Sequence, residues 1–122
     1  MKTYAGRIVN PGRHDEEIEV TVDGAVLRQR LDLRMYSPTG FAWGYGGSSP
    51  AQLALAILAD CAGDAMALRF HQDFKWRVIA RLHSGEPWQM TEASVRDWIQ
   101  SADISHAIAA AEAERDDNPI ED

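Results

Sequence analysis

The first third of the chain alternates apolar and polar residues with the period of a β-strand. Residues 18–22 alternate strictly, and Asp23-Gly24 then supplies the positive φ angles of a two-residue turn before a return strand over 25–27. Residues 3–9 predict a further strand, and residues 31–35 continue the alternation. We therefore predict a small N-terminal antiparallel sheet of about three strands.

The alternation stops over residues 37–49, which contain four glycines and three aromatic residues. Aromatic rings favour burial, and glycines permit left-handed backbone and close approach, so we expect an ordered loop rather than a flexible linker. The loop ends in a helix start, with Ser49 as N-cap, Pro50 at the first helical position and Gln52 completing a capping box.

The following residues have helical periodicity. Residues 53–58 are all apolar, which predicts a buried central helix that ends near Gly63. Asp64 can cap a second helix, in which apolar residues recur every four positions as far as Leu82. This pattern predicts one long amphipathic helix.

A break at residues 84–87, Ser-Gly-Glu-Pro, precedes the last helical part of the chain. Thr91 is expected to open a short helix beyond it. Residues 107–113 have high helix propensity, but only Ile104 and Ile108 offer apolar anchors there. We expect this segment to fray unless it docks on a partner.

Length and composition fit one compact domain, because the chain has 122 residues with 45% hydrophobic and 25% charged content. We predict an α+β domain over residues 1–103, built from the sheet, the glycine-rich loop and three to four helices. Residues 104–122 are predicted to form an alanine-rich helical or frayed segment with an acidic, disordered end.

The net charge of −7 lies mostly at one end of the chain. Residues 112–122 contain six acidic residues and one arginine, a net charge of −5, which leaves −2 for residues 1–111. A nearly neutral body argues against non-specific nucleic-acid binding, which needs many Lys and Arg contacts to phosphates. The single cysteine, Cys61, excludes an internal disulfide. Without a signal peptide or an apolar span, the sequence predicts a cytoplasmic protein without membrane contact.

The segment from Trp43 to Gln52 is the best candidate site. A helix N-terminus offers unpaired N–H groups and partial positive charge, and preceding glycines add amides that can surround phosphate oxygens. Aromatic rings there can stack on a base. The alternative is a structural crossover from strand to helix, since neither G-x-G-x-x-G nor a Walker loop is complete. The candidate ligand-binding residues are Tyr36, Trp43, Gly44, Tyr45, Gly46, Gly47, Ser48, Ser49, Gln52 and Lys75.

No catalytic or metal site is predicted. His71 and Asp73 lack further ligands for a metal, Cys61 fits a small core residue, and Ser48 lacks the G-x-S-x-G context of a nucleophile. No cofactor is expected. A basic cluster is interpreted first as a solvated helix face and second as a site for an anionic partner; it consists of Arg69, Lys75, Arg77 and Arg81. An acidic cluster is interpreted first as a solvated strand edge and second as a site for a basic protein; it consists of Asp15, Glu16, Glu17 and Glu19.

Four segments together resemble a small family of unknown function in bacteria and their phages. They are V-x-V-D-G-x-x-L at 20–27, S-P-x-G-F-x-W-G-Y-G-G-S-x-P-A-Q-L-A-L-A at 37–56, Q-x-F-K at 72–75, and M-T to W-I at 90–99. The resemblance covers roughly residues 3–100 and implies glycine at position 49, where this chain has Ser49. It implies no enzyme activity. It implies a small stand-alone protein that acts on host processes such as bacterial immunity, inside the bacterial host cell if phage-encoded.

These observations favour a non-enzymatic binding protein that inhibits a bacterial defence system by holding a nucleotide-like or anionic ligand at Trp43–Gln52. A second hypothesis is an acidic inhibitor that blocks the basic, nucleic-acid-binding surface of a host defence protein. A third is a nucleotide hydrolase that uses Ser48, His71 or His83. A homo-oligomer is compatible with the first hypothesis, because several chains can enclose one ligand.

Overall fold

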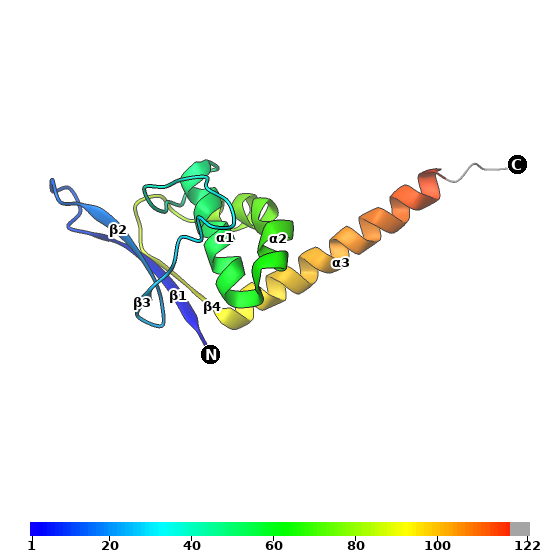
Figure 1. Cartoon of the computed structure of the whole chain (residues 1–122), viewed down its shortest axis with the longest axis horizontal. Coiled ribbons are helices and arrows are strands. Elements are labelled where there is room, and N and C mark those ends of the chain that lie inside the picture. Colours follow the sequence, from blue (N-terminus) through cyan, green and yellow to red (C-terminus); the bar gives the residue numbers. More distant parts are fainter. Residues whose placement is uncertain (118–122) are drawn as a thin grey trace, which may run out of the picture.

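The computed structural model describes residues 1–117 and shows an antiparallel sheet followed by helices (Figure 1). The sheet has the order β3-β2-β1-β4. Its strands are β1 (Thr3–Val9), β2 (Glu17–Val22), β3 (Ala25–Val26) and β4 (Trp88–Thr91). The helices are α1 (Ser48–Ala62), α2 (Asp64–Arg77) and α3 (Glu92–Asp117), with a 3-10 turn, η1 (Ile79–Arg81), after α2. The predicted α+β class is confirmed.

The N-terminal hairpin forms where the sequence predicts it. Asp23 and Gly24 have φ angles of 51° and 83°, and β2 and β3 pair antiparallel with Thr21 opposite Val26. The strand predicted over residues 3–9 is β1. The fourth strand, β4, was not predicted: it is four residues long and pairs with the other edge of β1, with Gly6 opposite Trp88.

The strand predicted over residues 31–35 is wrong. Residues 27–37 contain no strand, and Arg30 has a φ of 56°. Its guanidinium bonds Asp32 at 3.0 Å and reaches Asp64 on α2 at 3.1 Å. These ion pairs and the left-handed backbone at Arg30 turn the chain away from the sheet.

The predicted cap of α1 is also wrong, because the N-cap is Gly47 and no side chain caps the helix. The Ser49 hydroxyl instead lies 2.9 Å from the Ser37 hydroxyl. The Gln52 amide bonds the preceding segment rather than the helix end, so it completes no capping box.

The long second helix is interrupted earlier than predicted. α2 ends at Arg77, and Val78 has a φ of −121° and a ψ of −60°. The carbonyl of Ile79 then accepts the Gly44 N–H at 3.0 Å. The apolar residues that recur as far as Leu82 therefore pack against the same core, although α2 ends at Arg77. Beyond that point, the loop that contains Gly44 provides the hydrogen-bond donor that a continuing helix would have provided.

α1 is the buried central helix that the sequence predicts. All residues from Pro50 to Ala59 are buried. The core residues around it come from the sheet, α2 and α3, and include Tyr4, Val20, Phe70, Phe74, Val95 and Ile99. Cys61 is a buried free thiol, as expected for a core residue.

α3 begins after Thr91, whose hydroxyl accepts the Ser94 N–H at 3.1 Å. The helix passes without a break through the predicted boundary at residue 103 and ends at Asp117. The segment predicted to be helical or frayed is helical as far as Asp117, where helix propensity is high, and residues 118–122 of the predicted disordered end lie outside the described part. No helix within residues 1–117 has the length and apolar content to cross a bilayer.

Candidate functional site

The N-terminus of α1 has unsatisfied backbone donors. Its first turn contains no acidic residue, and no side chain caps it. Pro50 has no N–H, and the Ala51 N–H bonds the Gly47 carbonyl at 3.0 Å. Within residues 1–117, the N–H groups of Ser48 and Ser49 have no acceptor. The positive end of the helix dipole is therefore not neutralised by the described residues.

Two exposed aromatic rings lie against the glycines that precede this helix end. A Cβ on Gly46 would overlap the Trp76 indole, and a Cβ on Gly47 would lie 2.6 Å from the Tyr45 ring. Tyr45 is 52% exposed and Trp76 is 57% exposed. Glycine at both positions lets the rings lie directly on the backbone beside the start of α1.

Lys75 is a buried cation without a counter-ion in the described part of the chain. The residue is 8% exposed, and no carboxylate of residues 1–113, whose side chains the structure describes, pairs with it. The ammonium lies 4.2 Å from the centroid of the Trp76 ring, a cation–π contact. Among described side-chain atoms only Trp88 Nε1 is both sealed from solvent and without a partner, so the Lys75 ammonium keeps an opening to solvent.

The helical hairpin brings Lys75 to the start of α1. Only Gly63 separates α1 from α2, so the two helices run side by side in opposite directions (Figure 1). The last turn of α2 therefore lies beside the first turn of α1, and Trp76 contacts Gly46 there. We define the anion site as Gly46, Gly47, Ser48, Lys75 and the two rings.

Several predicted ligand residues are used by the fold. Trp43 is buried and its indole N–H donates to the Glu86 carbonyl at 3.0 Å. Gln52 is fully buried and makes four hydrogen bonds to backbone groups. Gly44 has a φ of 91°, and a Cβ there would lie 2.7 Å from Ser84. These residues shape the loop and the crossover from sheet to helix.

Tyr36 bonds His71 within the fold. The His71 Nδ1 lies 2.8 Å from the Ala67 carbonyl and donates to it, so Nε2 accepts the Tyr36 hydroxyl at 2.8 Å. The Gln72 amide donates to the same hydroxyl at 3.3 Å. Asp73 bonds His106 rather than His71, at 2.8 Å. The structure therefore does not join His71 and Asp73 in one site.

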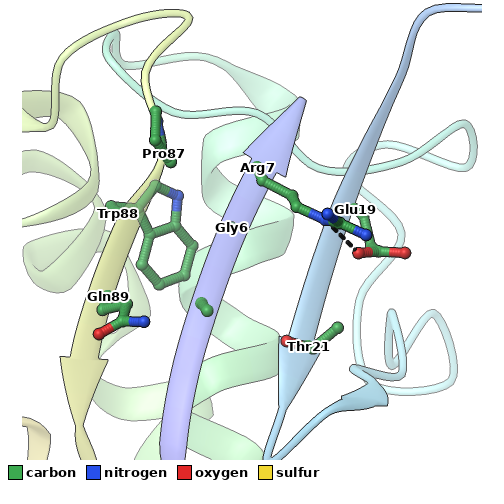
Figure 2. Close-up of a pocket in the computed structure, with 8 residues that line it drawn as sticks. Gly6, Arg7, Glu19, Thr21, Pro87, Trp88 and Gln89 are labelled. Atoms are coloured by element: carbon green, nitrogen blue, oxygen red, sulfur yellow. Dashed lines mark hydrogen bonds and ion pairs between the residues drawn. The ribbon is translucent and has the colours of Figure 1, made fainter. Parts of the chain in front are cut away.

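Trp76 was missed by sequence reasoning because an exposed aromatic on a polar helix face fits no motif. A hollow on the outer face of the sheet was also missed, since it depends on the pairing of β4 with β1. It has a volume of about 420 Å³, with Ala5, Thr21 and Gln89 in its lining and the Arg7–Glu19 ion pair at one side (Figure 2). Trp88 borders it from β4, with its indole against Gly6.

The structure shows an α+β domain whose central helix has an uncapped N-terminus. Comparison of the sequence with known families then identifies the family to which the chain belongs. Residues 4–101 match a family described as a family of unknown function, DUF6166. The chain belongs to this family. Comparison with curated proteins and with solved structures found no match.

Proposed function

We propose that this protein is a non-enzymatic binding protein that holds a small phosphate-bearing ligand at the anion site. The observation that carries the proposal is Lys75, a buried residue in the last turn of α2, without a described counter-ion, beside the uncapped N-terminus of α1. Two sources of positive charge lie together there, and an anion would compensate both.

The electrostatics favour an anion over a neutral ligand. Even partial burial of an unpaired charge is costly, and a cation–π contact of about 1–2 kcal/mol leaves the charge in place. The Ser48 and Ser49 amides offer two hydrogen-bond donors to an oxyanion. A phosphate group meets both requirements, because it carries negative charge and several acceptor oxygens.

The exposed rings of Tyr45 and Trp76 extend the proposal to a nucleotide-like ligand. Aromatic side chains stack on bases, and both of these residues are more than half exposed beside the proposed phosphate position. If the ligand is a signalling nucleotide, its sequestration would give the inhibition of a bacterial defence system that the family resemblance implies.

The test compares Lys75→Met with wild type by thermal shift and calorimetry against inorganic phosphate and a panel of mono-, di- and cyclic nucleotides. A ligand at a hundred times its Kd should stabilise the wild type by about 2.7 kcal/mol. Lys75→Met should lose most of that gain, yet be at least as stable as wild type without ligand, because methionine removes a buried charge from a similar volume. Arg81→Met, an exposed cation after α2, is the matched control and should bind normally.

Two results would overturn the proposal. One is that phosphate and every nucleotide of the panel leave the wild type unchanged in both measurements. The other is a ligand that binds Lys75→Met as tightly as wild type, which would show that the buried ammonium takes no part in recognition.

A further inference from the structure

The edge of β2 is left open where β3 ends. β3 is two residues long, and the residue after it, Leu27, donates its N–H to the Val20 carbonyl at 3.0 Å. The chain then leaves the sheet. Within residues 1–117, no further backbone hydrogen bond joins the first half of β2 to a neighbour on that side. β2 is therefore an edge strand from Glu17 to Glu19.

Ile18 directs its backbone groups to this open edge. In an antiparallel ladder, the N–H and the carbonyl of one residue point to the same side, and successive residues point to opposite sides. The Val20 carbonyl points toward β3, so Ile18, two residues earlier, directs its N–H and carbonyl to the same side. The backbone groups of Glu17 and Glu19 face β1. Unpaired backbone groups on a strand edge form a template for another extended chain.

A hollow of about 470 Å³ lies along this edge. The departing chain and the loop that contains Phe41 form its far wall. Ile18 shares the inner face of the sheet with the buried Val20, but it is 41% exposed, where the β1–β2 hairpin extends past the helices (Figure 1). The hollow therefore has unpaired backbone groups along one side and apolar side chains on the inner face.

The charges along the edge restrict what can occupy it. Glu17 is exposed, and it belongs to no ion pair among residues 1–113, whose side chains are described. Glu19 pairs with Arg7 at 2.6 Å, and Arg28 lines the hollow just after Leu27, so the uncompensated negative charge lies at Glu17. A basic side chain opposite Glu17 would be attracted to it.

The same charges act against the two occupants that this chain could itself supply. The edge of β2 in a second copy would place glutamates opposite glutamates, and charged residues on an edge oppose such pairing. Residues 112–122 have a net charge of −5, so the end of the chain would also be repelled. An extended segment of another protein, with a basic residue, fits the edge better.

We propose that the edge of β2 over Glu17–Glu19 binds an extended segment of a partner protein, which adds a strand to the sheet. The segment runs antiparallel to β2, as β3 does, and one of its residues pairs with Ile18 through two main-chain hydrogen bonds. That residue is apolar, because its side chain lies on the inner face beside Ile18 and Phe41. The next residue is basic, because its side chain lies on the outer face opposite Glu17. This inference does not depend on the anion site.

The test is fluorescence anisotropy of a labelled peptide, Thr-Val-Lys-Val-Lys-Val-Thr, titrated with the full chain. The wild type should bind this peptide more tightly than a peptide with glutamate in place of lysine. Glu17→Lys should weaken binding of the lysine peptide about fivefold or more, because an attractive cross-strand pair becomes a repulsive one. Glu86→Lys, which makes the same charge change in the exposed loop before β4, is the matched control and should bind like wild type. Circular dichroism of each variant establishes that the fold is retained.

N-methylation of the peptide distinguishes strand addition from simple charge attraction. An added strand turns alternate N–H groups toward its neighbour, and in the proposed register these are the valine N–H groups. Methyl groups on the valine nitrogens should abolish binding, whereas methyl groups on the lysine nitrogens should leave most of it.

Three results would overturn the proposal. The wild type binds no peptide of this set, or it binds the two methylated forms equally. The third is hydrogen exchange of the Ile18 amide that slows as the concentration of the free protein rises, because a second copy then fills the edge. In the proposed free state, the Ile18 amide exchanges faster than the Glu19 amide, which faces β1, at every concentration.

Discussion

A single side chain, Gln52, fixes the irregular segment before the glycine loop to the central helix. Its Oε1 accepts the N–H groups of Tyr36 at 2.8 Å and Ser37 at 3.1 Å. Its Nε2 donates to the carbonyls of Gln29 at 2.6 Å and Arg34 at 3.1 Å. Every hydrogen-bonding position of the amide is therefore used, which leaves Gln52 no group to offer a ligand in this conformation.

Replacement of Gln52 with leucine should strongly destabilise the protein. The leucine keeps the side chain apolar and of similar size, but four backbone groups lose their partner, and unsatisfied buried groups cost about 1–3 kcal/mol each. We expect the free energy of unfolding to fall by about 3 kcal/mol or more in urea denaturation. Gln89→Leu, at an exposed position of β4, should change it by less than about 0.5 kcal/mol. Equal effects of the two substitutions would contradict the assigned role.

At the scale of elements, the start of α3 is tied to the start of β1. Glu92 accepts the Lys2 N–H at 3.0 Å and the Arg96 Nε–H at 2.9 Å. The Glu92 N–H in turn donates to the Lys2 carbonyl at 2.8 Å. The backbone hydrogen bond from Lys2, followed by that from Arg96, lowers the pKa of the Glu92 carboxyl below its ordinary 4.5.

This lowered pKa predicts a pH-dependent contribution of Glu92 to stability. Because the folded-state pKa is below the unfolded value, the contribution is fully present above pH 4.5 and is lost as the pH falls through the lowered pKa. Glu92→Gln should therefore be less stable than wild type near neutral pH, and the two should converge in acid. Urea titrations across the acidic range measure the difference, with Glu86→Gln, in the exposed loop before β4, as control. A difference that is constant with pH would refute the linkage.

At the scale of the whole molecule, the body and the projecting part of α3 are separate in their contribution to stability. Among residues 110–113, the last whose side chains the structure describes, none belongs to the core cluster. A chain that ends after Ala109 should keep the unfolding free energy of the full chain within about 0.5 kcal/mol, measured by urea denaturation. A large loss would show that residues 110–122 stabilise the body.

The parts of the fold that the sequence predicted are those determined by local pattern. Strict alternation around Asp23-Gly24 specified the hairpin, and an apolar run specified the buried helix. β4 was missed because its four residues become a strand only by pairing with β1, far away in the chain. Residues 31–35 alternate like a strand, but the Gln52 amide donates to the Arg34 carbonyl and the Asp64 carboxylate pairs with Arg30. These contacts take the place of strand pairing.

The candidate site was predictable only in part for the same reason. The glycines and the helix start are contiguous in sequence, so they could be recognised together. Lys75 could belong to the candidate site only if its helix packs beside the glycine-rich loop. The contact of Trp76 with Gly46 shows that the helix does so. The uncapped start of α1 could not be predicted, because Ser49 is a good capping residue whose hydroxyl turns to Ser37.

Gly63 alone connects α1 to α2 and makes the two helices a tight antiparallel hairpin. Its φ of 95° and ψ of 170° reverse the chain in a single residue, at the end opposite to Lys75 and Gly46. Between this turn and the anion site, buried residues of both helices belong to one core cluster. An anion held between the first turn of α1 and the last turn of α2 would therefore restrain both helices along their whole length. Its binding should slow amide hydrogen exchange in residues that do not contact it.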